Sequence, residues 1–186
     1  AADTAEFYGG VCVTAVGGEW TVIADRVMVG NLSTDIYIDA EEPTLYLEGW
    51  RMSGERLRAD VEHLTLTAAR FTGPDVSGSA GELDIDLLTN GFTLRDVALA
   101  GTAFQVTGTL ATLQGTVLRV EGAGVTTCIG LEPPPFAIES SVATVDLSDR
   151  AVLLDQGLLR VGNLRIPLSE ELTLSEATLA GLERMG

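Results

Sequence analysis

Residues 23–49, IADRVMVGNLSTDIYIDAEEPTLYLEG, decide the fold, because they hold two apolar strands, a polar turn and a closing glycine. The pattern returns in 51–73, RMSGERLRADVEHLTLTAARFTG, and more loosely in 81–101 and 102–122. A further strand pair follows in 136–168. A unit this short cannot bury its own apolar face, so neighbouring units must stack on one another. We therefore predict an all-β fold within a single domain, residues 1–186, with repeat units at about 20–49, 50–73, 81–101, 102–122 and 136–168.

Apolar and polar residues alternate along most of these strands, which is typical of strands with one buried face. The alternation slips by one residue in places, as between Leu94 and Val97 and between Val61 and Leu64. A slip turns the later side chains to the other face unless the strand bends. We interpret each slip as a corner at which a strand crosses to a facing sheet. The result is a repeat-built β-jellyroll of two facing, curved antiparallel sheets that is open along one side or at its ends.

The alternating apolar residues are expected to face the interior between the two sheets. If the sheets pack fully, these residues form a closed core; if the sheets splay, the same residues line an apolar groove suited to acyl chains. The sequence leaves both alternatives open. The residues concerned are Ile23, Val27, Ile36, Ile38, Leu45, Leu47, Leu64, Leu66, Leu83, Ile85, Leu87, Phe92, Leu94, Phe104, Val106, Leu118, Val120, Phe136 and Ile138.

Turn-forming residues separate the predicted strands, as at Gly30-Asn31, Asn90-Gly91 and Ser148-Asp149-Arg150. Three consecutive prolines at 133–135 cannot sit inside a sheet and mark a break in the repeat. In the tail, Leu172 and Leu174 alternate as in a strand. We expect a terminal strand there and a short helix beginning after Ser175.

The chain is strongly acidic, with a formal net charge of −16 from 27 acidic and 11 basic residues. Such a surface repels phosphate backbones and anionic membrane faces, so we expect no nucleic-acid partner and no charge-driven membrane docking. The sequence also lacks an uninterrupted apolar run near the 18 or so residues that a spanning helix requires.

The first residues, Ala1-Ala2-Asp3-Thr4, are small ones of the kind that follow a signal-peptidase cut. They favour an exported protein whose signal peptide has been removed. Cys12 and Cys128 bracket the repeat region, and an even pair in an exported chain is compatible with one disulfide. Two buried free thiols, or pairing with cysteines elsewhere in a longer precursor, remain open alternatives.

Catalytic chemistry is poorly supported by the residues present. The single histidine, His63, cannot build a multi-histidine metal centre, and a serine triad would depend on it alone. Asp84 and Asp86 share one face of a predicted strand and are expected to point to solvent. No phosphate loop, dinucleotide fingerprint or Cys-x-x-Cys pair is present. We expect no catalytic residue, no metal and no cofactor, and therefore no enzyme.

Two units carry related tetrapeptides, Ala24-Asp25-Arg26-Val27 and Arg58-Ala59-Asp60-Val61, each in register with the repeat. In this they resemble the OstA-like domain of lipopolysaccharide transport, found in its periplasmic bridge protein and in the N-terminal part of its outer-membrane translocon. The resemblance covers roughly residues 12–168. The segment from Cys128 through the proline run to 164–168 is similar to the translocon branch, although Ile166-Pro167-Leu168 lacks the aromatic residue of that branch.

This resemblance implies a jelly-roll whose hydrophobic groove accepts the acyl chains of a lipid or glycolipid. It also implies that terminal edge strands join other envelope proteins by strand addition, and that the protein lies in the periplasm or at the outer envelope. The acidic surface requires the head of an anionic glycolipid to lie outside the protein or to be bridged by divalent cations. The alternative function is a structural subunit of an outer-envelope complex, with a filled interior and assembly through its edge strands.

Overall fold

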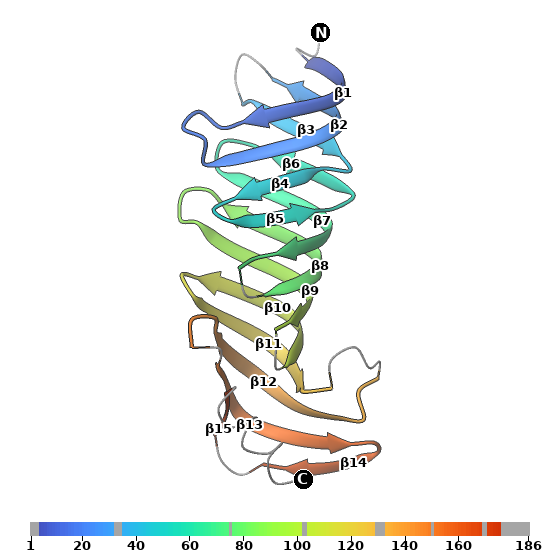
Figure 1. Ribbon diagram of the computed structural model, residues 1–186, viewed down its shortest axis with the longest axis vertical. Helices are drawn as coiled ribbons and strands as arrows, with labels where there is room; N and C mark the ends of the chain where they lie inside the picture. The colour runs from blue at the N-terminus through green and yellow to red at the C-terminus, as the bar shows by residue number, and fades with distance from the viewer. Residues whose placement is uncertain are drawn as a thin grey trace. The chain divides into compact units, whose positions relative to one another are not determined.

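Every regular element among the described residues is a β-strand, and the strands pair antiparallel (Figure 1). The computed structural model describes residues 4–31, 35–74, 76–101, 104–128, 133–149, 151–168 and 171–175. The predicted all-β, jelly-roll-like fold is therefore confirmed. The strands are β1 (Thr4–Thr14), β2 (Trp20–Gly30), β3 (Tyr37–Glu41), β4 (Thr44–Leu47), β5 (Trp50–Ser53), β6 (Arg56–Ala59), β7 (His63–Thr72), β8 (Ser77–Asp86), β9 (Gly91–Ala100), β10 (Gln105–Gln114), β11 (Val117–Thr126), β12 (Phe136–Asp146), β13 (Ala151–Val161), β14 (Leu164–Pro167) and β15 (Leu172–Ser175).

The chain divides into two compact units, unit 1 from Ala1 to Leu94 and unit 2 from Arg95 to Gly186. The division falls inside β9, so it does not follow a boundary between sequence repeats. The terminal strand predicted at Leu172 and Leu174 is present as β15. The short helix expected after Ser175 lies outside the described residues.

All the described strands belong to one hydrogen-bonded sheet, and in unit 1 the long strands bend so that their two halves pair with different strands in two walls of it, which we call the two sheets. The first half of β2 pairs with β4, whereas its second half pairs with β3. Strand β7 likewise pairs with β6 through its first half and with β5 through its second. The short strands β4 and β5 thus extend one sheet, and β3 and β6 extend the other. This pairing explains the slips in the hydrophobic pattern, because each bend re-aims the later side chains toward the shared interior.

The bends coincide with residues in the left-handed region of backbone conformation. Ala68 in β7 has φ of 49° and Asp96 in β9 has φ of 51°. The corner predicted between Leu94 and Val97 is therefore confirmed. The corner predicted between Val61 and Leu64 is wrong: Val61 lies in the turn between β6 and β7 and is 75% exposed. The bend of that repeat lies at Ala68 instead.

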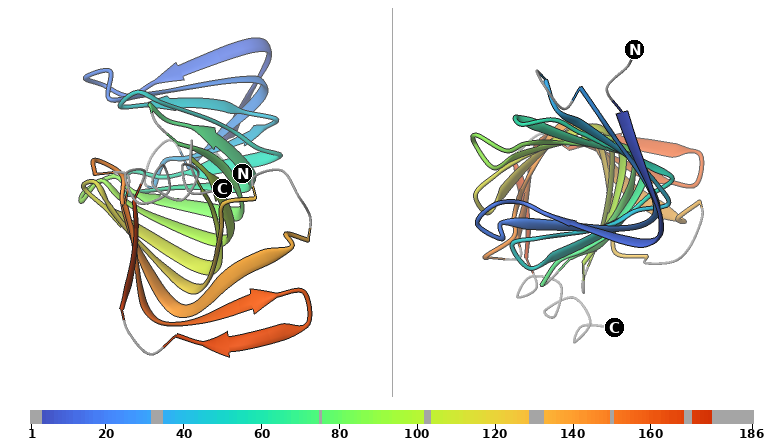
Figure 2. Two further views of the ribbon diagram at one scale, coloured as in Figure 1. Left: turned by 60° about the horizontal axis from the view of Figure 1, so that its bottom comes forward. Right: turned by 90° about the horizontal axis from the view of Figure 1, so that it is seen from above.

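In unit 2, β10, β11, β12 and β13 pair in sequence and are strongly curved (Figure 2). Strand β13 then pairs with β15 through Ala151–Leu154 and with β14 through Leu158–Val161. Left-handed residues again mark the bends, at Gly122 in β11 and Gln156 in β13. Beside them, the buried Ser140 hydroxyl hydrogen-bonds to the carbonyls of Val142 and Asp155, each at 2.7 Å.

Both interiors are filled by aliphatic side chains. In unit 1, Val22 and Leu45 from one sheet and Leu57 from the other are fully buried. In unit 2, Val120 and Leu154 are also fully buried. No buried side-chain nitrogen or oxygen among the described residues lacks a hydrogen-bond partner. The interiors of the two units are therefore packed with buried aliphatic side chains.

Candidate functional site

A cleft opens in unit 1 between the ends of the two sheets, on the side away from the strand bends. On one sheet Trp20 of β2 pairs with Leu47 of β4, and on the other Ile38 of β3 pairs with Ala59 of β6. All four residues line the cleft, together with the turns that follow these strand ends. We call it the seam cleft; its volume is about 530 Å³. It is lined by Ala15, Val16, Glu19, Trp20, Ile36, Ile38, Leu47, Glu48, Ala59, Asp60, Val61, Leu87 and Asn90.

The seam cleft passes from a buried apolar floor to an exposed apolar mouth. Leu47 and Ala59 are 5% and 4% exposed, whereas Ile36 is 45% and Val61 75% exposed. Val16, in the turn between β1 and β2, is fully exposed. Exposed aliphatic side chains around one opening cost hydration free energy when they are left in water, which is typical of a surface that meets an apolar partner.

Carboxylates surround this apolar lining. The Asp60 carboxylate accepts hydrogen bonds from the backbone amides of Glu62 and His63, both at 2.8 Å. These two bonds hold the pKa of Asp60 below its ordinary value. Glu19 and Glu48 complete the acidic rim, and no basic residue is among the lining residues. The electrostatics of the cleft therefore disfavour an anionic group at its mouth.

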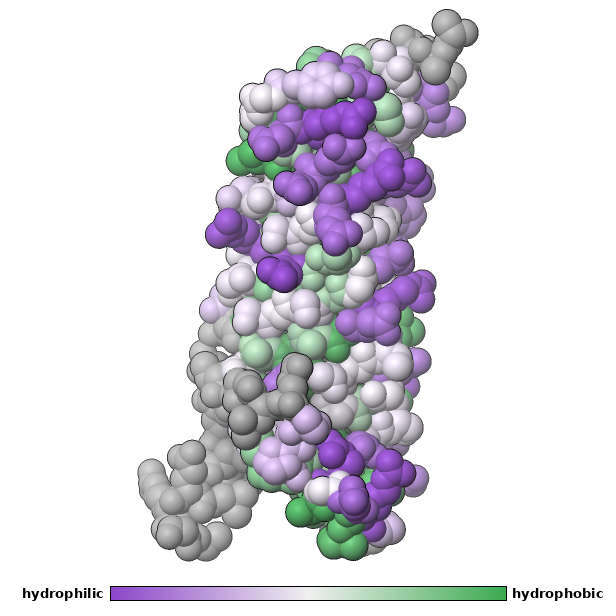
Figure 3. Space-filling model, turned by 90° about the vertical axis from the view of Figure 1, so that its right-hand side faces the viewer, coloured by the Kyte–Doolittle hydropathy of each residue, from purple (hydrophilic) through white to green (hydrophobic). Residues whose placement is uncertain are grey.

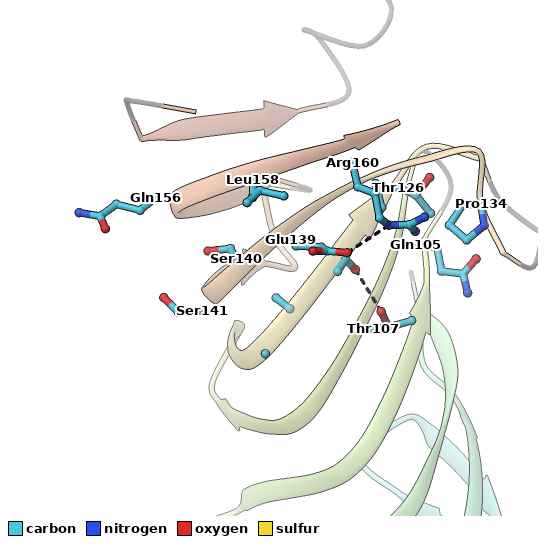
Figure 4. A pocket seen from close by; sticks show the side chains of 14 residues that line it. Gln105, Thr107, Thr126, Pro134, Glu139, Ser140, Ser141, Gln156, Leu158 and Arg160 are labelled. Atoms are coloured by element: carbon cyan, nitrogen blue, oxygen red, sulfur yellow. Dashed lines mark hydrogen bonds and ion pairs between the residues drawn. The ribbon is translucent and has the colours of Figure 1, made fainter. Parts of the chain in front are cut away.

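A second hollow lies in unit 2, on the solvent-facing side of β10, β11, β12 and β13 (Figure 4). We call it the outer hollow; its volume is about 760 Å³. Gly122 and Gly124 lie on its floor, and their lack of side chains helps to open it. Six uncharged polar side chains lie in its lining beside glycines, apolar residues and one acid and one base; the lining comprises Gln105, Thr107, Gly122, Ala123, Gly124, Thr126, Pro134, Ala137, Glu139, Ser140, Ser141, Gln156, Leu158 and Arg160.

The two charged groups of the outer hollow pair with each other. The Arg160 guanidinium donates from Nε to Glu139 Oε1 at 3.1 Å. Figure 4 shows this pair between Thr107 on one side and the Leu158 side chain on the other. The hollow therefore presents little net charge.

Most of the residues predicted to face a groove or core are buried in the core. Ile38, Leu87 and Ile138 are half-buried, and Ile23, Ile36 and Phe136 are exposed. Four of the predicted residues, Ile36, Ile38, Leu47 and Leu87, line the seam cleft. The buried ones are Val27, Leu45, Leu47, Leu64, Leu66, Leu83, Ile85, Phe92, Leu94, Phe104, Val106, Leu118 and Val120.

Several cleft residues were missed by the alternation pattern because they lie at strand starts or in turns. Val16 and Val61 belong to connections between strands, and Trp20 is the first residue of β2. The signal that marks Val16 and Val61 is an aliphatic side chain within a turn sequence, where polar residues are usual.

The two cysteines are free thiols in this structure, so the expected disulfide between Cys12 and Cys128 is not formed. The alternative of two buried free thiols also fails, because Cys12 is exposed on β1 and Cys128 is only partly buried. No disulfide therefore links Cys12 to Cys128 across the repeat region.

His63 is exposed at the start of β7, where its backbone amide donates a hydrogen bond to the Asp60 carboxylate. Asp86 caps a turn through the amides of Leu88 and Thr89, and Asp84 accepts a hydrogen bond from the Thr65 hydroxyl at 3.1 Å. Within the described ranges, no group of three or more His, Cys, Asp or Glu residues is placed to hold a metal ion. The described residues also contain no helix long and apolar enough to cross a membrane.

The fold and the cleft define a class: an all-β protein of stacked strand pairs with filled interiors and an apolar seam. No protein-family model matches this sequence, and no curated protein matches it either. The Ala-Asp tetrapeptides lie in different settings, since 24–27 forms a bend within β2 and 58–61 forms the end of β6 and the following turn.

Proposed function

We propose that this chain is a non-catalytic cell-envelope protein of the OstA-like type, exported to the periplasm or the outer envelope, which binds or passes lipid acyl chains. The observation that carries the proposal is the seam cleft, an apolar slot between the ends of two sheets. The sequence resemblance is its second support. Enzymatic activity is not part of the proposal.

An extended hydrocarbon chain fits the chemistry of the seam cleft. Leu47 and Ala59 form a floor that is already dry, and Ile36 and Val61 bring aliphatic side chains to the mouth. Each methylene that leaves water for such a site gains about 0.8 kcal/mol. Micromolar affinity corresponds to about 8 kcal/mol, so about ten buried methylenes are needed to reach it, and more once the entropy cost of association is included.

The acidic rim decides how a headgroup is placed. Glu19, Glu48 and Asp60 surround the mouth, and the whole chain carries a net charge of −16. An anionic head is repelled unless divalent cations bridge it, whereas an uncharged head meets no penalty. We therefore expect the acyl chain to enter first, with its head outside the cleft.

A titration with an uncharged monoacylglycerol whose chain carries a pyrene tests the proposal. Val61→Asp and Ile36→Asp place a carboxylate in the mouth, and we expect each to weaken binding at least tenfold, because the bound chain would bury a charge. Both residues are exposed, so folding is expected to be retained.

Val117→Asp is the matched control, because Val117 is a valine that is 42% exposed on β11 and lies outside the seam cleft. It should bind the probe as the parent chain does. Absence of saturable fluorescence with the parent chain, or equal binding by Val61→Asp, would contradict the proposal.

A second candidate function is a structural subunit of an outer-envelope complex, and the filled interiors favour it. Val22, Leu45 and Leu57 leave no continuous trough through unit 1. Partners would then add to edge strands such as β1 and β14. Every residue of the edge strand β14 is exposed, and Figure 3 shows apolar surface at the lower end of the view.

Sedimentation velocity distinguishes this second function. Self-assembly through β14 predicts larger species at higher protein concentration, and Ile166→Arg, which puts a charge on that edge, should reduce them. A monomer at all concentrations, combined with lipid binding at the seam cleft, favours the first function.

A further inference from the structure

We propose that the outer hollow of unit 2 is a binding site for a short, uncharged oligosaccharide. No part of the proposed lipid function requires this site, since the seam cleft lies wholly in unit 1 and the outer hollow wholly in unit 2.

Two glycines of β11 help to form the hollow on this face of the sheet, because they carry no side chain. Register places Gly124 between Thr107 of β10 and Glu139 of β12, so one side chain is missing from this row of the sheet. A Cβ added at Gly124 would lie 2.9 Å from Thr107 Oγ1, so a side chain there would require the Thr107 side chain to move. Gly122, with φ of 60°, adds to the same gap at the bend of β11.

The polar groups that build the floor are already engaged with the protein. Thr107 donates to the Gly124 carbonyl at 3.3 Å, and Thr126 donates to the Phe136 carbonyl at 2.8 Å. The Ser140 hydroxyl is likewise engaged. These groups fix the shape of the hollow and do not offer new partners to a ligand.

Three uncharged groups are left for a ligand. The side chains of Gln105, Ser141 and Gln156 make no hydrogen bond with the described residues, and Figure 4 shows them on opposite sides of the hollow. An amide offers two donors and one acceptor, and a hydroxyl both donates and accepts. Sugar hydroxyls also do both, so they match these groups in either direction.

The charged groups around the hollow are already paired, which favours an uncharged ligand. Arg160 is satisfied by Glu139, and Arg165 lies 4.0 Å from the other oxygen of the same carboxylate. Among the described residues that line the hollow, no cation is unpaired and able to receive a phosphate, sulfate or uronate, and the net negative charge of the chain repels anions. Leu158, Ala137 and Pro134 supply the apolar patches on which the C–H faces of a sugar ring can pack.

Binding of the intact chain to an immobilised panel of uncharged hexose and N-acetylhexosamine oligosaccharides, beside sulfated and uronate glycans, tests the proposal. We expect binding to members of the uncharged set only. The double variant Gln105→Ala/Gln156→Ala should bind those members at least tenfold more weakly, because it removes the free amides on both sides.

Gln114→Ala is the matched control, since Gln114 is an exposed glutamine of β10 that lies outside the hollow. It should bind as the parent chain does, and unchanged thermal unfolding of all variants shows that the fold is intact. Binding to no uncharged glycan, binding only to anionic glycans, or full binding by the double variant each overturns the proposal. The result of the lipid titration is independent of this one, because it tests the seam cleft of unit 1.

Discussion

Asp39 is a buried carboxylate held by two guanidinium groups. It is 7% exposed on β3, and Arg56 of β6 donates to both of its oxygens, from Nε at 2.7 Å. Arg58 lies 3.5 Å away on the same strand as Arg56. The hydrogen bonds from Arg56 lower the pKa of Asp39, against the opposing effect of its burial.

Asp39→Asn should destabilise unit 1 by about 1–2 kcal/mol, because the charge-assisted bonds are lost while Arg56 remains half exposed to water. A carboxylate whose pKa is lowered on folding stabilises the protein above its unfolded pKa. That stabilisation is lost as the pH falls from about 5 toward the lowered value. Urea unfolding at pH 7 and pH 3 measures both effects, and an equal difference between parent and variant at the two pH values would contradict the account.

Non-glycine residues at the bends store backbone strain. Ala68 and Gln156 adopt left-handed conformations, and both are exposed. A left-handed conformation costs an L-residue about 1–2 kcal/mol, and glycine avoids this cost. Gly122 occupies the equivalent bend of β11 without strain.

Ala68→Gly should therefore stabilise the chain by about 0.5–1 kcal/mol, since the relief of strain exceeds the added entropy of the unfolded glycine. Gly122→Ala should destabilise it by about 1–2 kcal/mol, because its new Cβ is strained and lies 3.1 Å from Thr109 Oγ1. Denaturant midpoints measure both. A loss of stability in Ala68→Gly would contradict the account, because it would show that the strain at Ala68 is smaller than the entropy that glycine adds to the unfolded chain.

At the scale of the element, three connections between strands are closed by the same kind of hydrogen bond. Asp60, Asp86 and Asp146 each sit at the end of a strand or just past it and accept hydrogen bonds from two backbone amides of the following turn. Hydrogen bonds from the turns lower the pKa of all three carboxyl groups. An aspartate side chain thus closes each of these three turns.

Asp86→Ala should open the turn between β8 and β9 without unfolding the sheets. The amides of Leu88 and Thr89 lose their acceptor, so their hydrogen exchange should accelerate, while exchange in the centres of β7 and β8 stays slow. Amide-resolved exchange at pH 7 measures this. Unchanged protection at Leu88 and Thr89 would show that the carboxylate does not hold the turn.

Strands and turns follow from local chemistry and were predictable for that reason. Period-two patterns such as Leu83 and Ile85 give strand β8, and Asn90, with φ of 53°, gives the turn before β9. The bend at Ala68 was not predictable from its residue type, because alanine has no preference for the left-handed region. Only the pairing of β7 with both β6 and β5 requires a bend there.

At the scale of the whole chain, the apolar pattern predicted an interior but could not decide whether it is filled. Closure depends on whether side chains such as Leu45 and Leu57 meet across the sheets, which is a tertiary property. Of the residues predicted to line a groove or a core, Ile36, Ile38, Leu47 and Leu87 line the seam cleft. Its remaining lining comes from turns that long-range pairing brings together.

The central claim is that the seam cleft holds acyl chains, and lipid carried through purification tests it most directly. The parent chain and Val61→Asp are purified from the envelope fraction of the same host without detergent, extracted with organic solvent and compared by mass spectrometry. The account predicts near-stoichiometric lipid with the parent chain and little with Val61→Asp. A parent chain free of lipid, or equal lipid in both proteins, would contradict it.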